Sequence, residues 1–174
     1  NYFRHITKKY PDVIIDVDSK VKIDNLYFDM NCLIHPCSHN VTKNNKKLVI
    51  LHNKAEKSQK YKTESSFHTE LEIKIFNEIA TYLDKLITVV NPQLVYMAID
   101  GVAPRAKMEQ QRIRRFRSIK IKELEDTVYD KYGIDNETFD TNCITPGTIF
   151  MYKLSIFLKK YIEVRYKKDT KKYI

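Results

Sequence analysis

The sequence has no tryptophan, three glycines, five prolines and three cysteines among its 174 residues. Three cysteines are too few for a disulfide framework, which favours a reducing compartment. We expect the cytoplasm, with the nucleus as the alternative. No apolar run approaches the roughly 20 residues that cross a bilayer, so we expect no membrane span. The polar, aromatic N-terminus predicts no signal peptide, and because the first residue is Asn1 we expect the natural start upstream.

Positive charge is in excess. Lysine and arginine number 31 against 22 aspartates and glutamates, a formal net charge of +9. Such a balance favours phosphate-rich partners, either nucleic acid or an anionic membrane surface. Scarce glycine and tryptophan beside abundant lysine, asparagine, isoleucine and tyrosine is also the pattern of an AT-rich coding sequence. The position of the charges is therefore more informative than their number.

The apolar pattern predicts one α/β domain, without an internal repeat or a Gly/Ser-rich linker. Apolar runs at 25–30 and 94–99 predict strands, and the apolar period of 67–90 predicts a helix between them. Ser66 is a suitable cap for this helix, and Pro92 prevents its continuation. Strand, helix and strand make a βαβ unit with a parallel pair. The continuous run 94–99 is typical of a strand buried on both faces.

Other segments are assigned from composition and from capping residues. Residues 1–12 predict a short amphipathic helix, and a long helix is expected over about 105–131. A further helix is expected to begin at Thr145, with Pro146 at its first position. Residues 40–66 are polar with little periodicity, which predicts an exposed insertion; a small hairpin is the alternative.

Two aspartates follow the two predicted strands, Asp29 the first and Asp100 the second. In open α/β sheets, ligands bind beyond the carboxyl ends of the strands. Carboxylate oxygens are suitable ligands for Mg²⁺ or Mn²⁺, and two such ions activate water for phosphodiester cleavage. The alternative is that each aspartate ends a strand in a plain turn, Asp100-Gly101 in particular. Two carboxylates are also too few to offset two divalent cations.

The helix expected over 105–131 has two distinct faces, because each residue advances by about 100°. One sector holds a compact cationic group with an amide, namely Lys107, Gln111, Arg114 and Arg115. A separate sector is apolar and is expected to pack on the core, namely Ile113, Phe116, Leu124 and Val128. The cationic sector lies near the helix N-terminus, where anions are favoured, and predicts a phosphate site. The alternative is an ordinary solvated basic face.

Residues 32–39 contain four side chains that bind metals in other proteins, namely Cys32, His35, Cys37 and His39. Their spacing fits no standard zinc knuckle, so zinc is the less favoured interpretation. His35 follows Asp29 by six residues and is better interpreted as a polar group near a scissile phosphate. A structural histidine is the alternative.

Four stretches of the chain together resemble the Xrn-type 5′→3′ exoribonuclease family. They are YFRHITKKYP (2–11), DNLYFDMNCLIHPCSH (24–39), VYMAIDGVAPRAKMEQQRIRRFRS (95–118) and FDTNCITPGTIFM (139–151). The resemblance implies a fold related to the PIN and flap-endonuclease groups. It also implies a processive, Mg²⁺-dependent hydrolase, with Mn²⁺ as the alternative ion, acting on RNA with a 5′ monophosphate.

The resemblance assigns roles to the residues already singled out. Asp29 and Asp100 match metal ligands, and His35 matches a residue that lines the active site. The basic pocket for the 5′ monophosphate corresponds to Lys107, Gln111, Arg114 and Arg115. One departure is Cys32, where the family usually has glycine.

The further acidic motifs of the family do not occur in this sequence. We therefore expect residues 1–174 to be the N-terminal portion of one nuclease domain, inactive alone, whose remaining metal ligands come from the rest of its polypeptide. The first alternative is a truncated, inactive relative that binds 5′-phosphorylated RNA or serves as a scaffold. The second is a related nuclease for DNA flaps, which the length of the 95–118 match disfavours.

Overall fold

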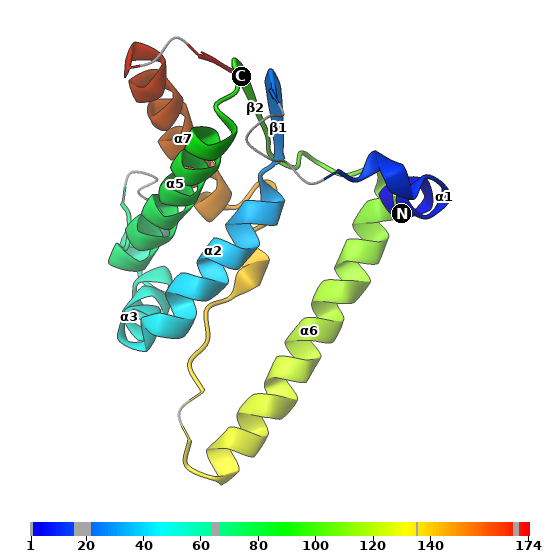
Figure 1. The fold of residues 1–174 in the computed structure, drawn as a ribbon. Coiled ribbons are helices and arrows are strands. Elements are labelled where there is room, and N and C mark those ends of the chain that lie inside the picture. The colour runs from blue at the N-terminus through cyan, green and yellow to red at the C-terminus, as the bar shows by residue number, and fades with distance from the viewer. Residues whose placement is uncertain (1, 16–21, 64–66, 135, 169–170) are drawn as a thin grey trace.

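A computed structural model of the chain describes residues 2–15, 22–63, 67–134, 136–168 and 171–174 (Figure 1). Within these residues, β1 (Asn25–Asp29), β2 (Leu94–Ala98) and β3 (Lys172–Tyr173) form a parallel sheet in the order β1-β2-β3. Helices lie between and beside the strands, which confirms the predicted α/β class with a parallel sheet.

The helical elements account for most of the described chain. In order they are α1 (Tyr2–Lys9), η1 (Pro11–Val13), α2 (Asn31–Asn44), α3 (Lys46–Glu56), α4 (Gln59–Thr63), α5 (Glu70–Val90), α6 (Arg105–Lys131), η2 (Thr141–Cys143) and α7 (Ile149–Lys168). Figure 1 shows α5 between α2 and α7, and both pack on it. The long helix α6 projects away from this layer. Among the described residues, no helix is long and apolar enough to cross a membrane.

Helix α5 is the centre of the core, because one apolar side chain per turn faces inward. Its fully buried residues include Leu71, Ile75, Ile79, Leu83 and Ile87. The helix begins three residues later than predicted, since Thr69 caps it by accepting a hydrogen bond from the Glu72 amide. Ser66, the predicted cap, lies outside the described residues. Asn91 ends the helix in the left-handed conformation at φ 47°, just before Pro92.

The sheet is buried on one face only. Val95 is fully buried, whereas Tyr96 and Tyr27 on the opposite face are 39% and 65% exposed. Their ring centroids lie 5.6 Å apart. The prediction that the strand at 94–99 is buried on both faces is therefore wrong. Helices α2, α5 and α7 supply the buried side, while the two tyrosines lie on a face that the described residues leave open.

Segment 40–66 is more ordered and less exposed than predicted. Its described residues form the end of α2, then α3 and α4, rather than a loop or a hairpin. Val49, His52 and Tyr61 are buried. The expectation of exposure is wrong at these positions because one face of α3 packs on α5. That the segment is an insertion remains a prediction.

The apolar sector of α6 does not pack on the core as predicted. Ile113, Phe116, Leu124 and Val128 are between 54% and 68% exposed. No described residue of α6 is buried. The period of the sequence identifies an apolar face correctly, but within the described residues nothing covers it.

A buried polar network joins the short helices to the core. The Lys153 ammonium lies 3.2 Å from the Glu72 carboxylate, and both side chains are fully buried. The Tyr61 hydroxyl donates to Glu72 over 3.2 Å, and the Lys153 ammonium lies 4.1 Å from the Tyr61 ring centroid. His52 Nδ1 is 2.9 Å from the Thr69 hydroxyl. The network links α3, α4 and α7 to the first turn of α5.

We expect Lys153→Met to lower the free energy of unfolding by about 3 kcal/mol, because it leaves the buried Glu72 carboxylate without its cation. Urea unfolding of wild type and variant measures the change. Lys160→Met is the matched control on the same helix, since Lys160 is exposed; its effect should stay within about 0.5 kcal/mol. A loss below about 1 kcal/mol for Lys153→Met would show that the pair contributes little.

We expect His52 to make the protein less stable in mild acid. Burial has the largest effect and lowers the pKa of this imidazole. The charge of Glu72 raises the pKa and the charge of Lys153 lowers it, each by less. The unfolded chain then takes up a proton near pH 6.5 while the folded chain does not, so stability falls as the pH drops below that value.

The change in unfolding free energy between pH 7.5 and pH 5.5 measures this effect. His52→Asn, which keeps a hydrogen-bonding group for Thr69, should reduce that change by about 1 kcal/mol. His39→Asn, at an exposed position of α2, is the control and should leave it unaltered. Equal pH dependence in wild type and His52→Asn would contradict the assignment.

Candidate functional site

The parallel pairing of β1 and β2 brings the two predicted metal ligands to one edge of the sheet. Asp29 is in register with Ala98, and the Met30 amide donates to the Ala98 carbonyl over 2.8 Å. Asp100 follows Ala98 by two residues. Both aspartates are exposed, and Asp29 Oδ1 accepts a hydrogen bond from the Asn31 amide at 3.1 Å. The carboxyl ends of the strands thus present two carboxylates to solvent, as predicted.

The Cys32 thiol lies beside the edge that carries Asp29 and Asp100. This free thiol is exposed in the first turn of α2. The charge of Asp29 raises the pKa of this thiol most, followed by desolvation, a hydrogen bond to Asp29 and the charge of Asp100. Two negative charges acting on one thiol show that both aspartates contribute to one region of negative potential. Such a region favours a cation.

The aspartate pair alone is a partial metal site. Among the described residues, no group of three or more histidine, cysteine, aspartate or glutamate side chains is placed to hold a metal ion. Asp29 and Asp100 remain the residues at this edge whose oxygens suit a hard divalent cation.

The structure does not bring the four candidate zinc ligands of residues 32–39 together, because Cys37 lies on the buried side of α2 and the other three lie on its exposed side. Cys32, His35 and His39 are exposed, whereas Cys37 is buried in the core cluster. The segment forms a helix directly after β1, rather than a strand end. His35 lies one turn beyond Cys32 on the exposed side of this helix. That position keeps it available to solvent near the start of α2.

The structure brings two of the four predicted phosphate residues into a pocket of about 430 Å³. Gln111 and Arg115 line it, together with Gly101 and apolar residues of α6 such as Phe116. Lys107 and Arg114 do not line this pocket and are exposed on α6. Because Gly101 directly follows Asp100, the pocket reaches from the acidic edge of the sheet to the cationic side of the helix.

The charges of α6 are arranged against its helix dipole. Its first half carries six cations and Glu109; the cations are Arg105, Lys107, Arg112, Arg114, Arg115 and Arg117. The first turn of a helix favours anions, so Arg105 and Lys107 oppose the dipole, and all six cations repel one another. Within the described part of the chain, no salt bridge joins any of the six to a carboxylate. A bound anion would relieve both effects.

The turn before α7 differs from the prediction. The helix begins at Ile149 instead of near Thr145, because the Thr148 hydroxyl accepts from the Met151 amide at 3.3 Å. Gly147, at φ 89°, makes the turn that precedes it. Thr145 is therefore free of a capping role, and its hydroxyl accepts a hydrogen bond from Arg115 Nη2 at 2.8 Å. Sequence reasoning missed this contact.

The same turn borders a second pocket, of about 570 Å³. Asp100 lines it from the end of β2, and Pro146 and Thr148 line it from the turn. Pro146 also lines the pocket beside Arg115. The turn is thus shared by the acidic edge of the sheet and the cationic side of α6.

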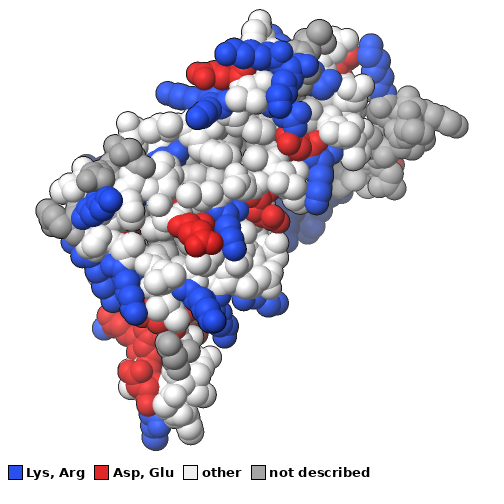
Figure 2. Space-filling model, turned by 90° about the vertical axis from the view of Figure 1, so that its left-hand side faces the viewer, with Lys and Arg blue, Asp and Glu red and all other residues white. Residues whose placement is uncertain are grey.

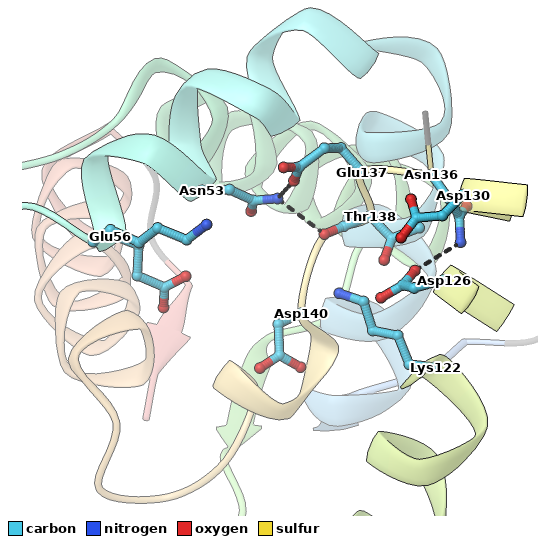
Figure 3. Close-up of a pocket in the computed structure, with 10 residues that line it drawn as sticks. Asn53, Glu56, Lys122, Asp126, Asp130, Asn136, Glu137, Thr138 and Asp140 are labelled. Atoms are coloured by element: carbon cyan, nitrogen blue, oxygen red, sulfur yellow. Dashed lines mark hydrogen bonds between the residues drawn. The ribbon is translucent and has the colours of Figure 1, made fainter. Parts of the chain in front are cut away.

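A third pocket, of about 450 Å³, lies apart from these residues (Figure 3). Its lining is mostly acidic and amide, and includes Glu56, Asp126, Asp130, Glu137 and Asp140. Asn136 Nδ2 donates to Asp126 over 3.1 Å, which ties the chain after α6 to that helix. None of the residues predicted for metal or phosphate lines this pocket. Its charge is unsuited to a nucleic-acid backbone.

The remaining positive charge is spread widely. Figure 2 shows lysine and arginine side chains over several parts of the face viewed there, with acidic residues between them. The basic side chains gather most densely at the top of this view and lie in smaller groups elsewhere.

Comparison with known proteins agrees with this geometry. The family model described as "XRN 5'-3' exonuclease N-terminus" matches residues 1–173. Relatives include 5'-3' exoribonuclease 2 of Gallus gallus, 36% identical over 97% of this chain, and 5'-3' exoribonuclease 1 of Homo sapiens, 38% identical over 97%. The 5'-3' exoribonuclease 1 of Saccharomyces cerevisiae is 36% identical over 98% of the chain.

The match covers a small share of these relatives, namely 19% of the Gallus protein, 9% of the human protein and 10% of the yeast protein. The matched region includes both aspartates, α6 and the turn before α7. A family model that spans nearly every residue, together with several relatives above 30% identity, shows that this chain belongs to the XRN 5'-3' exonuclease family.

Proposed function

We propose that this chain forms the N-terminal part of a 5′→3′ exoribonuclease that processively hydrolyses RNA carrying a 5′ monophosphate, with Mg²⁺ or Mn²⁺ as cofactor. The observation that carries the proposal is the adjacency of an acidic strand edge and a cationic helix half that forms no salt bridge with the described carboxylates. Asp100 lies two residues beyond the end of β2, and α6 begins five residues after Asp100. The named relatives are 5'-3' exoribonucleases, which supports this direction and substrate class.

Asp29 and Asp100 would hold the metal, because their exposed oxygens share one region of negative potential. A divalent ion supplies an activated water and stabilises the departing oxygen in phosphodiester hydrolysis. Two carboxylates do not balance two such ions. We therefore propose that the remainder of the polypeptide contributes further acidic ligands, and that residues 1–174 are inactive alone.

The cationic side of α6 would hold the 5′ phosphate. Arg115 and Arg114 offer forked donors, Lys107 a point charge and Gln111 a neutral amide donor. A monophosphate satisfies this small group of donors, whereas a triphosphate or a cap adds bulk and charge beyond it. His35, exposed near the start of α2, would donate to a phosphate oxygen or contact the first base.

Two exposed surfaces support a further partner from the same polypeptide. One is the open sheet face with Tyr27 and Tyr96, and the other is the apolar sector of α6 that includes Ile113 and Leu124. Exposed apolar surface of this kind is normally covered in a folded enzyme. We propose that residues 1–174 are one portion of a single nuclease domain, that 40–66 is an insertion within it, and that the free cysteines belong in a reducing, cytoplasmic setting.

Digestion of matched RNAs tests the proposal directly. We expect the full-length protein with Mg²⁺ to degrade 5′-monophosphate RNA at least about 100-fold faster than 5′-triphosphate RNA, because the donors of α6 fit one phosphate. Asp100→Ala should abolish degradation of both RNAs. Arg114→Ala/Arg115→Ala should leave slow degradation with a weakened preference for the monophosphate end.

Lys168→Ala, at the exposed end of α7, is the control and should behave as wild type. If wild type leaves RNA intact yet still binds 5′-phosphorylated ends, the chain belongs to an inactive RNA-binding relative. That second function is favoured by the small number of acidic ligands among the described residues. If wild type acts on DNA flaps in preference to RNA, both functions are wrong.

Mn²⁺ binding tests the acidic edge apart from catalysis. We expect Asp29→Asn and Asp100→Asn each to weaken Mn²⁺ binding to the full-length protein by at least about tenfold, since each removes one anionic ligand. Titration followed by electron paramagnetic resonance of free Mn²⁺ measures the affinity. Glu163→Gln, at an exposed position of α7, should have no effect. Unchanged affinity in both site variants would place the metal elsewhere.

A further inference from the structure

We propose that Thr145 is a positioning residue that orients the Arg115 guanidinium toward the 5′ phosphate of the substrate. This inference rests on the proposed function, because it assigns Arg115 to phosphate recognition. It adds a residue from outside α6 to the four that the cationic sector contains. It also predicts which atom of Thr145 matters, namely the hydroxyl oxygen.

The contact itself is a short hydrogen bond with a charged donor. Arg115 Nη2 donates to Thr145 Oγ1 over 2.8 Å, and the two residues are partly buried. A guanidinium carries five N–H donors in a rigid planar fork. One donor bound to Thr145 fixes the plane of the fork and leaves the others for an anion. Both residues line the same pocket of about 430 Å³.

Thr145 can act as an anchor because its turn is held from both sides. The Thr145 amide donates to the Cys143 carbonyl over 2.9 Å, and its own carbonyl accepts from the Thr148 hydroxyl over 2.9 Å. Thr148 also caps α7, which the buried ion pair between Lys153 and Glu72 fixes to the core. The hydroxyl of Thr145 is therefore attached to the rigid part of the molecule.

Arg115 needs such an anchor because its own helix supplies little support. No described residue of α6 is buried, and Figure 1 shows the helix projecting from the body. A long arginine side chain on an exposed helix samples many rotamers, and holding it before the substrate arrives removes an entropic penalty from binding. Arg114, the neighbouring cation, is exposed and has no such contact among the described hydrogen bonds.

The turn that contains Thr145 also borders the acidic edge of the sheet. Pro146, next to Thr145, lines the Arg115 pocket and also the pocket that contains Asp100. A hydrogen bond from α6 to this turn therefore holds the cationic group at a set distance from the strand edge. Because the Thr145 hydroxyl is engaged by Arg115, we expect its effect on the substrate to pass through that guanidinium.

The experiment compares Thr145→Val, which removes the hydroxyl at nearly constant shape, with Thr145→Ser, which keeps it. Each full-length variant is given matched RNAs that end in a 5′ monophosphate or a 5′ hydroxyl. Affinity without divalent metal and kcat/KM with Mg²⁺ are both measured. We expect Thr145→Val to lower the preference for the monophosphate about tenfold, the effect of one hydrogen bond with a charged donor, and Thr145→Ser to stay within about twofold of wild type.

A purely structural role predicts a different pattern. It would weaken the binding and cleavage of both RNAs equally, whereas the positioning role weakens those of the 5′-monophosphate RNA selectively and leaves those of the 5′-hydroxyl RNA unchanged. Arg115→Ala completes a double-mutant cycle. We expect Thr145→Val to have no further effect on end preference in the Arg115→Ala background, because the hydroxyl then has no guanidinium to orient.

The outcomes distinguish an error in the proposed phosphate site from an error in the role of Thr145. If wild type shows no preference for the 5′ monophosphate, or Arg115→Ala does not reduce it, the proposed phosphate site is wrong and the role of Thr145 is overturned with it. If Arg115→Ala reduces the preference but Thr145→Val does not, the phosphate site stands and the inference about Thr145 alone is wrong. Equal effects of Thr145→Val in both backgrounds would also overturn it.

Discussion

The parallel pairing of β1 with β2 is the constraint on which the rest of the site depends. Because the strands run in the same direction, their carboxyl ends meet at one edge, and Asp29 comes into register with Ala98 just before Asp100. Helix α2 leaves the same edge from Met30, and α6 follows Asp100 after a short connection. This register places the acidic pair and the start of α2 at one edge, and the pocket lined by Gly101 and Arg115 connects that edge to α6.

The second organising feature is a charge arrangement that the fold alone does not favour. Six cations lie in the first half of α6, two of them in the first turn, where the helix dipole favours anions. The described carboxylates form no salt bridge with any of the six. Without a bound anion, the folded chain would be more stable if these cations were further apart. The hydrogen bond from Arg115 to Thr145 ties this helix half to a turn fixed by α7. In the proposed site, α6 would supply recognition of the phosphate and the turn before α7 would supply rigidity.

Much of this arrangement could be predicted, because it depends on local pattern. The apolar period predicted α5 and the strands on either side of it, and the strand ends predicted where Asp29 and Asp100 lie. The failures depend on tertiary partners. Periodicity identifies the apolar face of α6 but not what covers it, and threonine suits a helix cap as well as an arginine partner, so Thr145 was assigned to the wrong role. The short helices of 40–66 are polar, and His52 and Tyr61 are buried through tertiary contacts. These contacts include Thr69, Glu72 and Lys153, and the rings of Phe67 and Phe139.

The central claim is that the edge formed by Asp29 and Asp100 holds the catalytic metal. Anomalous diffraction from crystals of the full-length protein grown with Mn²⁺ tests it most directly. The account predicts an anomalous peak about 2 Å from carboxylate oxygens of both Asp29 and Asp100, with further acidic ligands from the rest of the polypeptide. Mn²⁺ peaks at other residues, with none between these two aspartates, would contradict it.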